Sequence, residues 1–293
     1  MDIVDKTKLE ALAQEVFPHS CIESAKRLGG MTNRTYQVKI AGANYVFRIP
    51  GEGTSDLINR SDEKISNALA CKLDIDAQVL YFDGKTGLKV SEYIEGAKTM
   101  SAENMRESKN IAEAAHLLNR LHTCKENTQV AFEVFNMAGR YESIITSNNV
   151  ALYDDYDEVR QQVMAIKNAL DELKVEKTPC HNDPLCENWV RDVSRMYLVD
   201  WEYAGMNDPL WDVADVSIEA DFDQEKDMLF LREYFQGEPN EETIFRFNAN
   251  KVFLDFLWSL WGKTRVPFDG QPLEDYAFKR YARMKNNLAS MKS

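Results

Sequence analysis

The segment Cys180-His181-Asn182-Asp183-Pro184-Leu185-Cys186-Glu187-Asn188, together with the later Asp200, decides the fold. Asp183 and Asn188 are five residues apart on a predicted tight loop, so both side chains can face one site. Asp200 ends the apolar run Tyr197-Leu198-Val199, which reads as a buried strand pointing to the same place. Phosphoryl transfer needs such a set, namely a carboxylate that orients and deprotonates a hydroxyl and oxygen ligands for Mg²⁺.

The order H-x-D-x-x-x-x-N followed by D-x-E resembles the catalytic and metal loops of protein-kinase-like phosphotransferases. The resemblance implies that Asp183 is the catalytic base and that Asn188 and Asp200 hold Mg²⁺. It also implies that His181 supports the loop. The alternative is an Asx-rich surface turn beside a buried strand, and the presence of both halves in order favours the catalytic interpretation.

Around this segment, hydrophobic periodicity divides the chain into a strand-rich first third and a helical remainder. Predicted strands cover 35–40, 44–49, 77–83 and 88–93, a short β-rich island covers 178–200, and predicted helices cover 5–17, 61–73, 101–123 and 154–173. Residues 127–151 and those after 267 carry no clear pattern. We therefore expect an α+β, protein-kinase-like bilobal fold: a small antiparallel β N-lobe over 1–92 and a large, mainly helical C-lobe over 93–293.

A turn ahead of the first clear strand is the candidate phosphate loop. Its glycines allow backbone N–H groups to approach phosphate closely, and its place before a β-hairpin strengthens an otherwise weak signal. The residues assigned to nucleotide contact in this turn are Gly29, Gly30, Thr32 and Asn33. Glu92 and Tyr93 lie in a segment that resembles the hinge offering backbone groups to adenine. ATP and Mg²⁺ are the expected cofactors.

Arg48 is the candidate cation for the nucleotide phosphates, and a solvated charge on a strand is the less favoured alternative. Protein kinases carry Lys at the corresponding place, and Arg stays charged and can bind phosphate oxygens bidentately. It needs an acidic partner on the helix that follows. We expect Glu63 in that role, with Glu52 and Asp62 as competitors.

Several segments together resemble the choline kinases, especially the bacterial type that supplies phosphocholine for cell-surface decoration. They are Leu28–Asn33, His181–Asn188, Asp200–Tyr203, Met206–Asp212 and Leu257–Trp261, and the resemblance spans about residues 25–265. It implies transfer of the γ-phosphoryl group of ATP to the hydroxyl of choline. Asp212 is expected to hold the metal loop in place.

Choline carries a quaternary ammonium group without N–H bonds, so aromatic faces must bind it, at about 0.5–2 kcal/mol per ring. Trp258 and Trp261 are three apart on one face of a predicted helix. Core packing is the alternative for both rings. The expected acceptor site consists of Glu202, Tyr203, Trp211, Glu219, Trp258 and Trp261, with Glu219 supplying negative charge.

Composition limits the other possibilities for this chain of 293 residues. The net charge of −13 disfavours nucleic acid and anionic lipid as partners. No apolar stretch approaches the roughly 20 residues that cross a bilayer, and the N-terminus lacks signal-peptide features, so a cytoplasmic enzyme without membrane insertion is expected. Five scattered cysteines suit a reducing compartment.

Other motifs for phosphate or zinc binding are not supported, because their residues have the wrong spacing. Gly84-Lys85-Thr86 and Gly262-Lys263-Thr264 end like Walker A loops, but the required earlier glycine is Val79 in one and Leu257 in the other. The group Cys180, His181 and Cys186 lacks the pairing of a zinc site. Ethanolamine, an aminoglycoside or thiamine remain as alternative acceptors, and a catalytically silent nucleotide-binding module remains as a different class. The oligomeric state stays open.

Overall fold

The computed structural model describes residues 3–29, 33–51 and 58–291. Its N-terminal elements are α1 (Ile3–Val16), β1 (Ile22–Gly29), β2 (Asn33–Ile40), β3 (Ala43–Pro50), α2 (Arg60–Lys72), β4 (Val79–Phe82) and β5 (Lys89–Glu92). The middle contains β6 (Lys98–Thr99), α3 (Ala102–Met105), α4 (Ser108–His122), α5 (Val134–Ser147) and α6 (Tyr156–Asp171). Then follow β7 (Thr178–Cys180), the 3₁₀ turn η2 (Cys186–Asn188), β8 (Trp189–Arg191), β9 (Met196–Leu198), β10 (Gly205–Asn207), α7 (Leu210–Glu219), α8 (Gln224–Phe235), α9 (Glu241–Asp269) and α10 (Gln271–Ser290).

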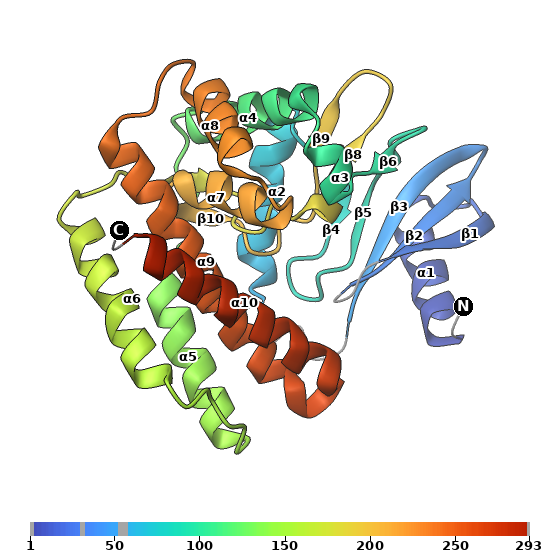
Figure 1. Cartoon of the computed structure of the whole chain (residues 1–293). Helices are drawn as coiled ribbons and strands as arrows, with labels where there is room; N and C mark the ends of the chain where they lie inside the picture. Colours follow the sequence, from blue (N-terminus) through green and yellow to red (C-terminus); the bar gives the residue numbers. More distant parts are fainter. Residues whose placement is uncertain (1–2, 30–32, 52–57, 292–293) are drawn as a thin grey trace.

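The N-lobe is an antiparallel sheet with strand order β1-β2-β3-β5-β4. Alternation along β2 buries Tyr36, Val38 and Ile40 on one face, where they meet a separate small core that includes Leu9 and Leu12 of α1. The sheet and α1 lie at one side of the molecule, and the helical C-lobe lies at the other (Figure 1). The predicted bilobal fold class is confirmed.

Helix α2 connects the two lobes. It begins at Asn59, whose side chain accepts a hydrogen bond from the backbone N–H of Ser61 at 3.0 Å. Ala70 near its end, and Ile75 just after it, belong to the large core of the C-lobe and not to the core under the sheet. The expected lobe boundary near residue 92 therefore stays a prediction, because part of 1–92 packs with the other lobe.

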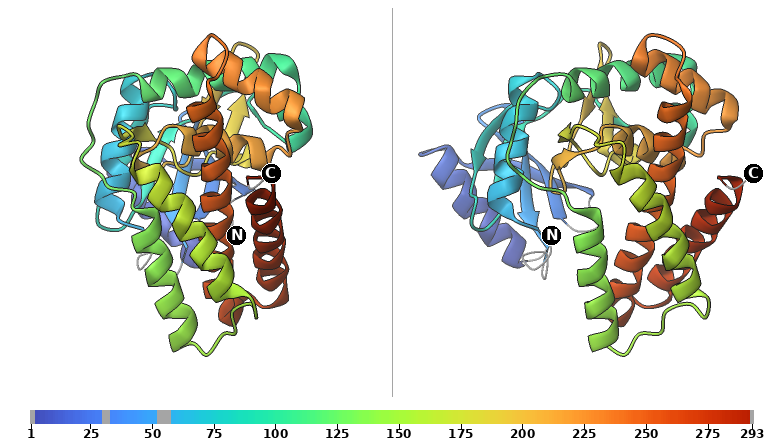
Figure 2. Two further views of the ribbon diagram at one scale, coloured as in Figure 1. Left: turned by 60° about the vertical axis from the view of Figure 1, so that its left-hand side comes forward. Right: turned by 90° about the vertical axis from the view of Figure 1, so that its left-hand side faces the viewer.

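The C-lobe is organised around α9, a helix of 29 residues. Helices α5, α6 and α10 run beside it, and α7 packs across it (Figures 1 and 2). Two small sheets, β6-β8-β9 and β10-β7, hold the 178–207 region against this helical core. They fix the catalytic loop, which lies between β7 and β8.

The predicted elements appear with few changes. The predicted helix 101–123 is two helices in the structure, because α3 ends before Arg106 and α4 begins after Glu107. Strand β1 and helices α5 and α10 were not predicted. Among the described residues, no helix is both long and apolar enough to cross a membrane.

Candidate active site

The carboxylate of Asp212 holds the catalytic loop from below. Its two oxygens accept the backbone N–H groups of His181 and Asn182, both at 2.7 Å. The ring of His122 in α4 contacts the same carboxylate at 3.0 Å and Tyr234 at 2.8 Å. Asp212 is fully buried in the first turn of α7. The catalytic loop is therefore attached to the helical core through its backbone, whereas the expected role of Asp212 was to hold the metal loop at Asp200.

The ring of His181 supports the loop from inside, in the position that the sequence predicts. Its Nε2 lies 3.0 Å from the carbonyl oxygen of Val199, and the backbone N–H of Asp183 donates to its Nδ1 at 3.3 Å. Burial lowers the pKa of His181 to about 4, so the ring is neutral at physiological pH. The two contacts together require the tautomer with hydrogen on Nε2.

Asp183, Asn188 and Asp200 converge on one place. The side-chain amide of Asn188 donates to the backbone oxygen of Asp183 at 2.8 Å, which fixes its orientation. Asp200 adopts a left-handed conformation with φ 68°, and its buried Oδ1 has no hydrogen-bond partner. An orphaned carboxylate oxygen beside an amide oxygen is the hard donor set that Mg²⁺ prefers. These residues fit the predicted metal site.

The proposed base, Asp183, is in a strongly acidic environment. Burial, followed by the charges of Asp200, Glu202 and Glu219, raises its pKa well above the usual value. Arg280 opposes this rise only partly. A carboxylate with a raised pKa in a cleft is typical of a catalytic acid or base.

On the nucleotide side, the expected ion pair between Arg48 and Glu63 is present and buried. Arg48 also donates to the carbonyl oxygen of Gly87 at 3.0 Å, and Arg60 contacts Glu63 at 2.8 Å. Burial alone would raise the pKa of Glu63, but the guanidinium of Arg48 holds it below the usual value. Arg48 is thus fixed 3.6 Å from Asp200, beside the candidate metal site.

Glu202 is placed differently from the prediction that it binds the acceptor. Its carboxylate accepts from the side chain of Asn33 at 2.9 Å and lies 3.3 Å from Arg60. Both partners come from the N-lobe, because the turn after Asp200 presents this side chain toward β2 and α2. Glu202 therefore connects the lobes on the nucleotide side.

The remaining nucleotide assignments stay predictions. Gly29 ends β1, and Gly30 and Thr32 lie outside the described residues. Glu92 ends β5, and Tyr93 follows it at the passage between the lobes.

Four aromatic rings form a continuous wall, called here the aromatic wall: Tyr203, Trp258, Trp261 and Tyr276. Ring centroids are 5.2 Å apart for Tyr203 and Trp258, 6.3 Å for Trp258 and Trp261, and 5.9 Å for Trp261 and Tyr276. Each pair meets edge to face. The indole N–H groups of both tryptophans are buried without a partner. Tyr276 was missed by the sequence analysis because it lies in α10, where no motif marks it.

Trp211 is not part of this wall, contrary to the prediction. It is 0% exposed, and its indole N–H donates to the carbonyl oxygen of Asn182 at 2.9 Å. Its ring meets Phe132 edge to face at 5.4 Å in the core. Trp211 supports the catalytic loop from beneath and offers no face to a substrate.

Glu219 lies at the other end of the wall and is already paired. Its carboxylate contacts Arg280 of α10 at 2.5 Å, and the Arg280 guanidinium lies 5.0 Å from the Tyr276 ring. Arg280 also contacts Asp255 of α9 at 3.2 Å. Glu219 therefore contributes charge to the site while its position is held by an ion pair.

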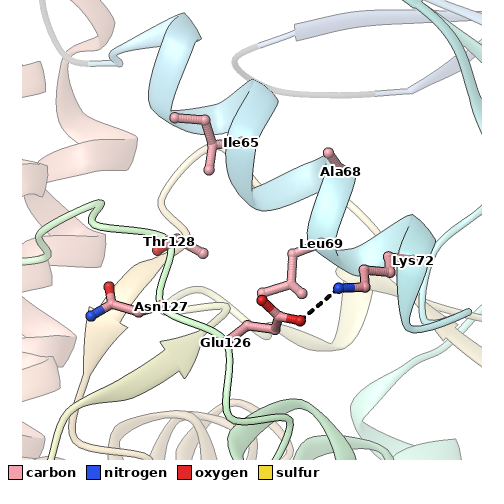
Figure 3. Close-up of a pocket in the computed structure, with 7 residues that line it drawn as sticks. All are labelled: Ile65, Ala68, Leu69, Lys72, Glu126, Asn127 and Thr128. Atoms are coloured by element: carbon pink, nitrogen blue, oxygen red, sulfur yellow. Dashed lines mark hydrogen bonds and ion pairs between the residues drawn. The ribbon is translucent and has the colours of Figure 1, made fainter.

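One further feature lies outside this site, and a second overlaps it. A hollow of about 230 Å³ lies between α2 and the loop after α4 (Figure 3). It is lined by Ile65, Ala68, Leu69, Lys72, Glu126, Asn127 and Thr128. His122, Cys180 and Asp212 form a buried group of ligand-type side chains, but both ring nitrogens of His122 already have protein partners.

A family model described as choline/ethanolamine kinase matches residues 25–250. The chain belongs to the choline/ethanolamine kinase family. Protein LicA of Haemophilus influenzae is 31% identical over 261 residues, which cover 86% of this chain and 76% of that protein. Human ethanolamine kinase 2 is 25% identical, with 94% of this chain and 78% of that protein covered.

Solved structures support the same assignment. The choline kinase LicA from Streptococcus pneumoniae matches with TM-score 0.85 and 32% identity, covering 98% of this chain and 99% of that chain. A choline/ethanolamine kinase family protein from Mesorhizobium loti matches with TM-score 0.86 and 33% identity, covering 98% and 95%. An aminoglycoside 2'-phosphotransferase, 15% identical with TM-score 0.69, shares the fold. As a member of the choline/ethanolamine kinase family, the protein is an ATP-dependent kinase.

Proposed function

We propose that this family member is a choline kinase, which transfers the γ-phosphoryl group of ATP to the hydroxyl of choline. The observation that carries the proposal is the aromatic wall beside Asp183. The side chain of Asn182, the residue before Asp183, donates to the carbonyl oxygen of Tyr203 at 3.0 Å, so the wall begins beside the catalytic loop. Edge-to-face packing leaves ring faces in several directions, and such faces attract a quaternary ammonium.

The chain's own residues account for positioning and proton transfer. The aromatic wall binds the cationic head, so the acceptor hydroxyl lies toward the catalytic loop. Asp183 accepts a hydrogen bond from that hydroxyl and takes its proton as the oxygen attacks phosphorus. Arg48 holds phosphate oxygens on the opposite side. Holding both reactants in line provides most of the rate enhancement.

Asn188 and Asp200 are the residues that would hold Mg²⁺. When bound, the ion neutralises charge on the transferring phosphoryl group. Because Oδ1 of Asp200 has no hydrogen-bond donor and only the guanidinium of Arg48 at 3.6 Å, an ion there would supply the close positive charge that this oxygen lacks. ATP as the phosphoryl donor and a cytoplasmic location belong to the same proposal, since the free thiols of the chain suit a reducing compartment.

The first test is Mg²⁺-dependent ATP consumption with choline, ethanolamine, thiamine and kanamycin as acceptors. We expect strong turnover with choline. Asp183→Asn should lower kcat by orders of magnitude and leave the KM for ATP nearly unchanged, because the amide keeps the shape but cannot take a proton. Asp157→Asn, an exposed change on α6, is the matched control and should behave as the unmodified protein.

Other outcomes have definite meanings. Turnover only with ethanolamine or another acceptor would retain Asp183 as the base and remove choline as the substrate. Full activity of Asp183→Asn would show that another group accepts the proton. Nucleotide binding without turnover on any alcohol would favour a binding module.

A further inference from the structure

Helix α7 presents a stripe of three carboxylates to the site: Asp212, Asp215 and Glu219. They stand at spacings of three and four residues, which places them on one face of the helix. The two ends of the stripe have strong partners. Asp212 accepts two backbone N–H groups of the catalytic loop, and Glu219 is paired with Arg280. Asp215 lies between these two anchored ends, so it faces the space between the catalytic loop and the aromatic wall.

The middle carboxylate has no partner of its own. Asp215 is 0% exposed, and neither of its two oxygens has a hydrogen-bond partner. A buried ionised carboxylate without a donor or a paired cation is very unfavourable. Because the other two carboxylates of the stripe are anchored and Asp215 is not, its partner is a ligand or a proton.

The groups around Asp215 give the site an excess of negative charge. On α7 itself these are Asp212 and Glu219, and the catalytic-loop segment contributes Asp183 and the Cys186 thiol. From α10 comes Arg280, and from α9 comes Asp255, which is bonded to Arg280. Arg280 is already shared by Glu219 and Asp255, and Arg283 of α10 is shared by the same two carboxylates, at 3.7 Å from Glu219 and 2.7 Å from Asp255. The charge of Asp215 also reaches the hydroxyl of Tyr276, so Asp215 lies near the aromatic wall.

We propose that Asp215 carries a proton while the acceptor site is empty and releases it to solvent when the cationic head of the acceptor enters. The step is balanced: the O–H bond of the carboxylic acid breaks, the proton leaves to water, and the substrate's positive charge replaces it. The inference rests on choline being the acceptor. It makes choline binding dependent on pH through a residue that does not take part in phosphoryl transfer.

Two effects favour protonated Asp215 in the empty site and ionised Asp215 in the occupied site. Burial, followed by Glu219 and Asp183, raises the pKa of Asp215 well above the usual value, which keeps the empty site neutral there. Choline cannot donate an N–H bond, but its charge favours the ionised carboxylate, and its polarised methyl groups can make weak C–H···O contacts. Binding therefore shifts the ionisation of Asp215, and mass action couples the two.

The test is calorimetric titration of choline into the protein with saturating Mg²⁺ and ADP, in two buffers of different ionisation enthalpy. The difference in heat gives the number of protons released without any turnover. We expect about one proton per choline for the unmodified protein near neutral pH. Asp215→Asn should release far less and bind choline on the order of tenfold more weakly. Asp183→Asn should keep the release, and Asp157→Asn should match the unmodified protein.

Three results would overturn the inference: no proton release by the unmodified protein, unchanged release by Asp215→Asn, or loss of release in Asp183→Asn alone. The last would place the proton on Asp183. If Asp215→Asn does not fold, the unmodified protein decides alone. At pH values below the pKa of Asp215 in the empty protein, the Kd for choline should fall by up to about tenfold for each unit by which the pH rises. A constant Kd between about pH 6 and about pH 9 would reject the idea. Failure of choline to bind at all would instead refute the proposed function, and this inference with it.

Discussion

Single residues decide how the catalytic loop is held, and Asp212 has the largest role. It is the acceptor for two consecutive backbone N–H groups, and it also contacts His122, which in turn contacts Tyr234. A loop with helical or strand hydrogen bonds would not need such a side chain. Here the backbone leaves regular structure between β7 and β8, so a carboxylate takes the place of a ladder partner.

Asp212→Asn should weaken both the loop and the fold. An amide offers one acceptor oxygen, so at least one buried N–H of His181 or Asn182 loses its partner. We expect a loss of about 1–3 kcal/mol in the free energy of unfolding and a clear fall in kcat. Urea denaturation measures the first and steady-state kinetics the second. Asp157→Asn, the same chemical change at an exposed position of α6, leaves no backbone N–H unpaired and serves as the control. Equal stability of Asp212→Asn and the unmodified protein would show that the loop holds itself.

Acid should lower the free energy of unfolding through the ring of His181. His181 has a pKa of about 4 in the folded protein, lower than the usual value near 6.5. A lowered pKa contributes stability that is present above the unfolded value and is lost as the pH falls toward the folded one. We therefore expect the free energy of unfolding to decrease by up to about 3 kcal/mol between about pH 6.5 and about pH 4 from this ring. Comparing urea denaturation of the unmodified protein with that of His181→Gln at several pH values isolates the contribution of this ring. Identical dependence of the free energy of unfolding on pH in the two proteins would contradict the prediction.

Sequence predicts residues that belong to a spaced motif better than residues that do not. Spacing groups Asp183, Asn188 and Asp200, and the resemblance to kinase loops supplies their expected roles. The Arg48–Glu63 pair follows from a strand face and the helix after it. Glu202 and Trp211 were assigned to the acceptor because they follow the metal loop. Their directions depend on a turn and on core packing, which have no period in sequence. Asp215 was not recognised, since a buried carboxylate on a helix looks like any polar residue until its neighbours are known.

Helix α9 contributes residues both to the core of the C-lobe and to the aromatic wall. Trp258 is 4% exposed and Trp261 is more exposed, although both lie on one face of the same helix. The first ring therefore combines packing with recognition, whereas the second contributes mainly to recognition.

Alanine substitution should separate these roles. Trp261→Ala should raise the KM for choline by about tenfold with little change in the KM for ATP, since one cation–π contact is lost. Trp258→Ala should raise the KM for choline and also destabilise the fold by about 3–5 kcal/mol, because it leaves a cavity. Leu260→Ala, a buried change on the same helix, is the control: it should destabilise without a selective effect on choline. Parallel increases of both KM values in Trp261→Ala would assign that ring to the core.

The elements that sequence missed lack the usual signals. Strand β1 has only scattered burial along its length, so it shows no alternation. Helix α9 is predicted only around Trp258 and Trp261, because most positions in its middle are buried and the pattern there shows no helical period. Helix α10 follows directly after Gly270 and brings Arg280 and Tyr276 to the site. Nothing near these two residues in sequence indicates that they face a loop made about ninety residues earlier.

One group of contacts between the lobes lies at the nucleotide side. Asn33 and Arg60 contact Glu202, and Arg48 contacts Asp200. The two acidic residues belong to one short segment of the C-lobe, and their partners belong to the N-lobe. A metal ion on Asp200 would compete with Arg48, so nucleotide binding and the relative position of the lobes are coupled.

The five cysteines have a practical consequence for observing that coupling. Cys21, which directly precedes β1, is exposed, whereas Cys180 and Cys186 beside the catalytic loop are buried. Burial raises the pKa of Cys180 well above the usual value and that of Cys186 to about 12, so neither forms a reactive thiolate at neutral pH. A maleimide fluorophore should therefore react with Cys21 on the N-lobe ahead of the partly exposed Cys71 and Cys124, and it should spare the catalytic loop. The natural sequence thus already provides an attachment point for following lobe movement in solution by fluorescence.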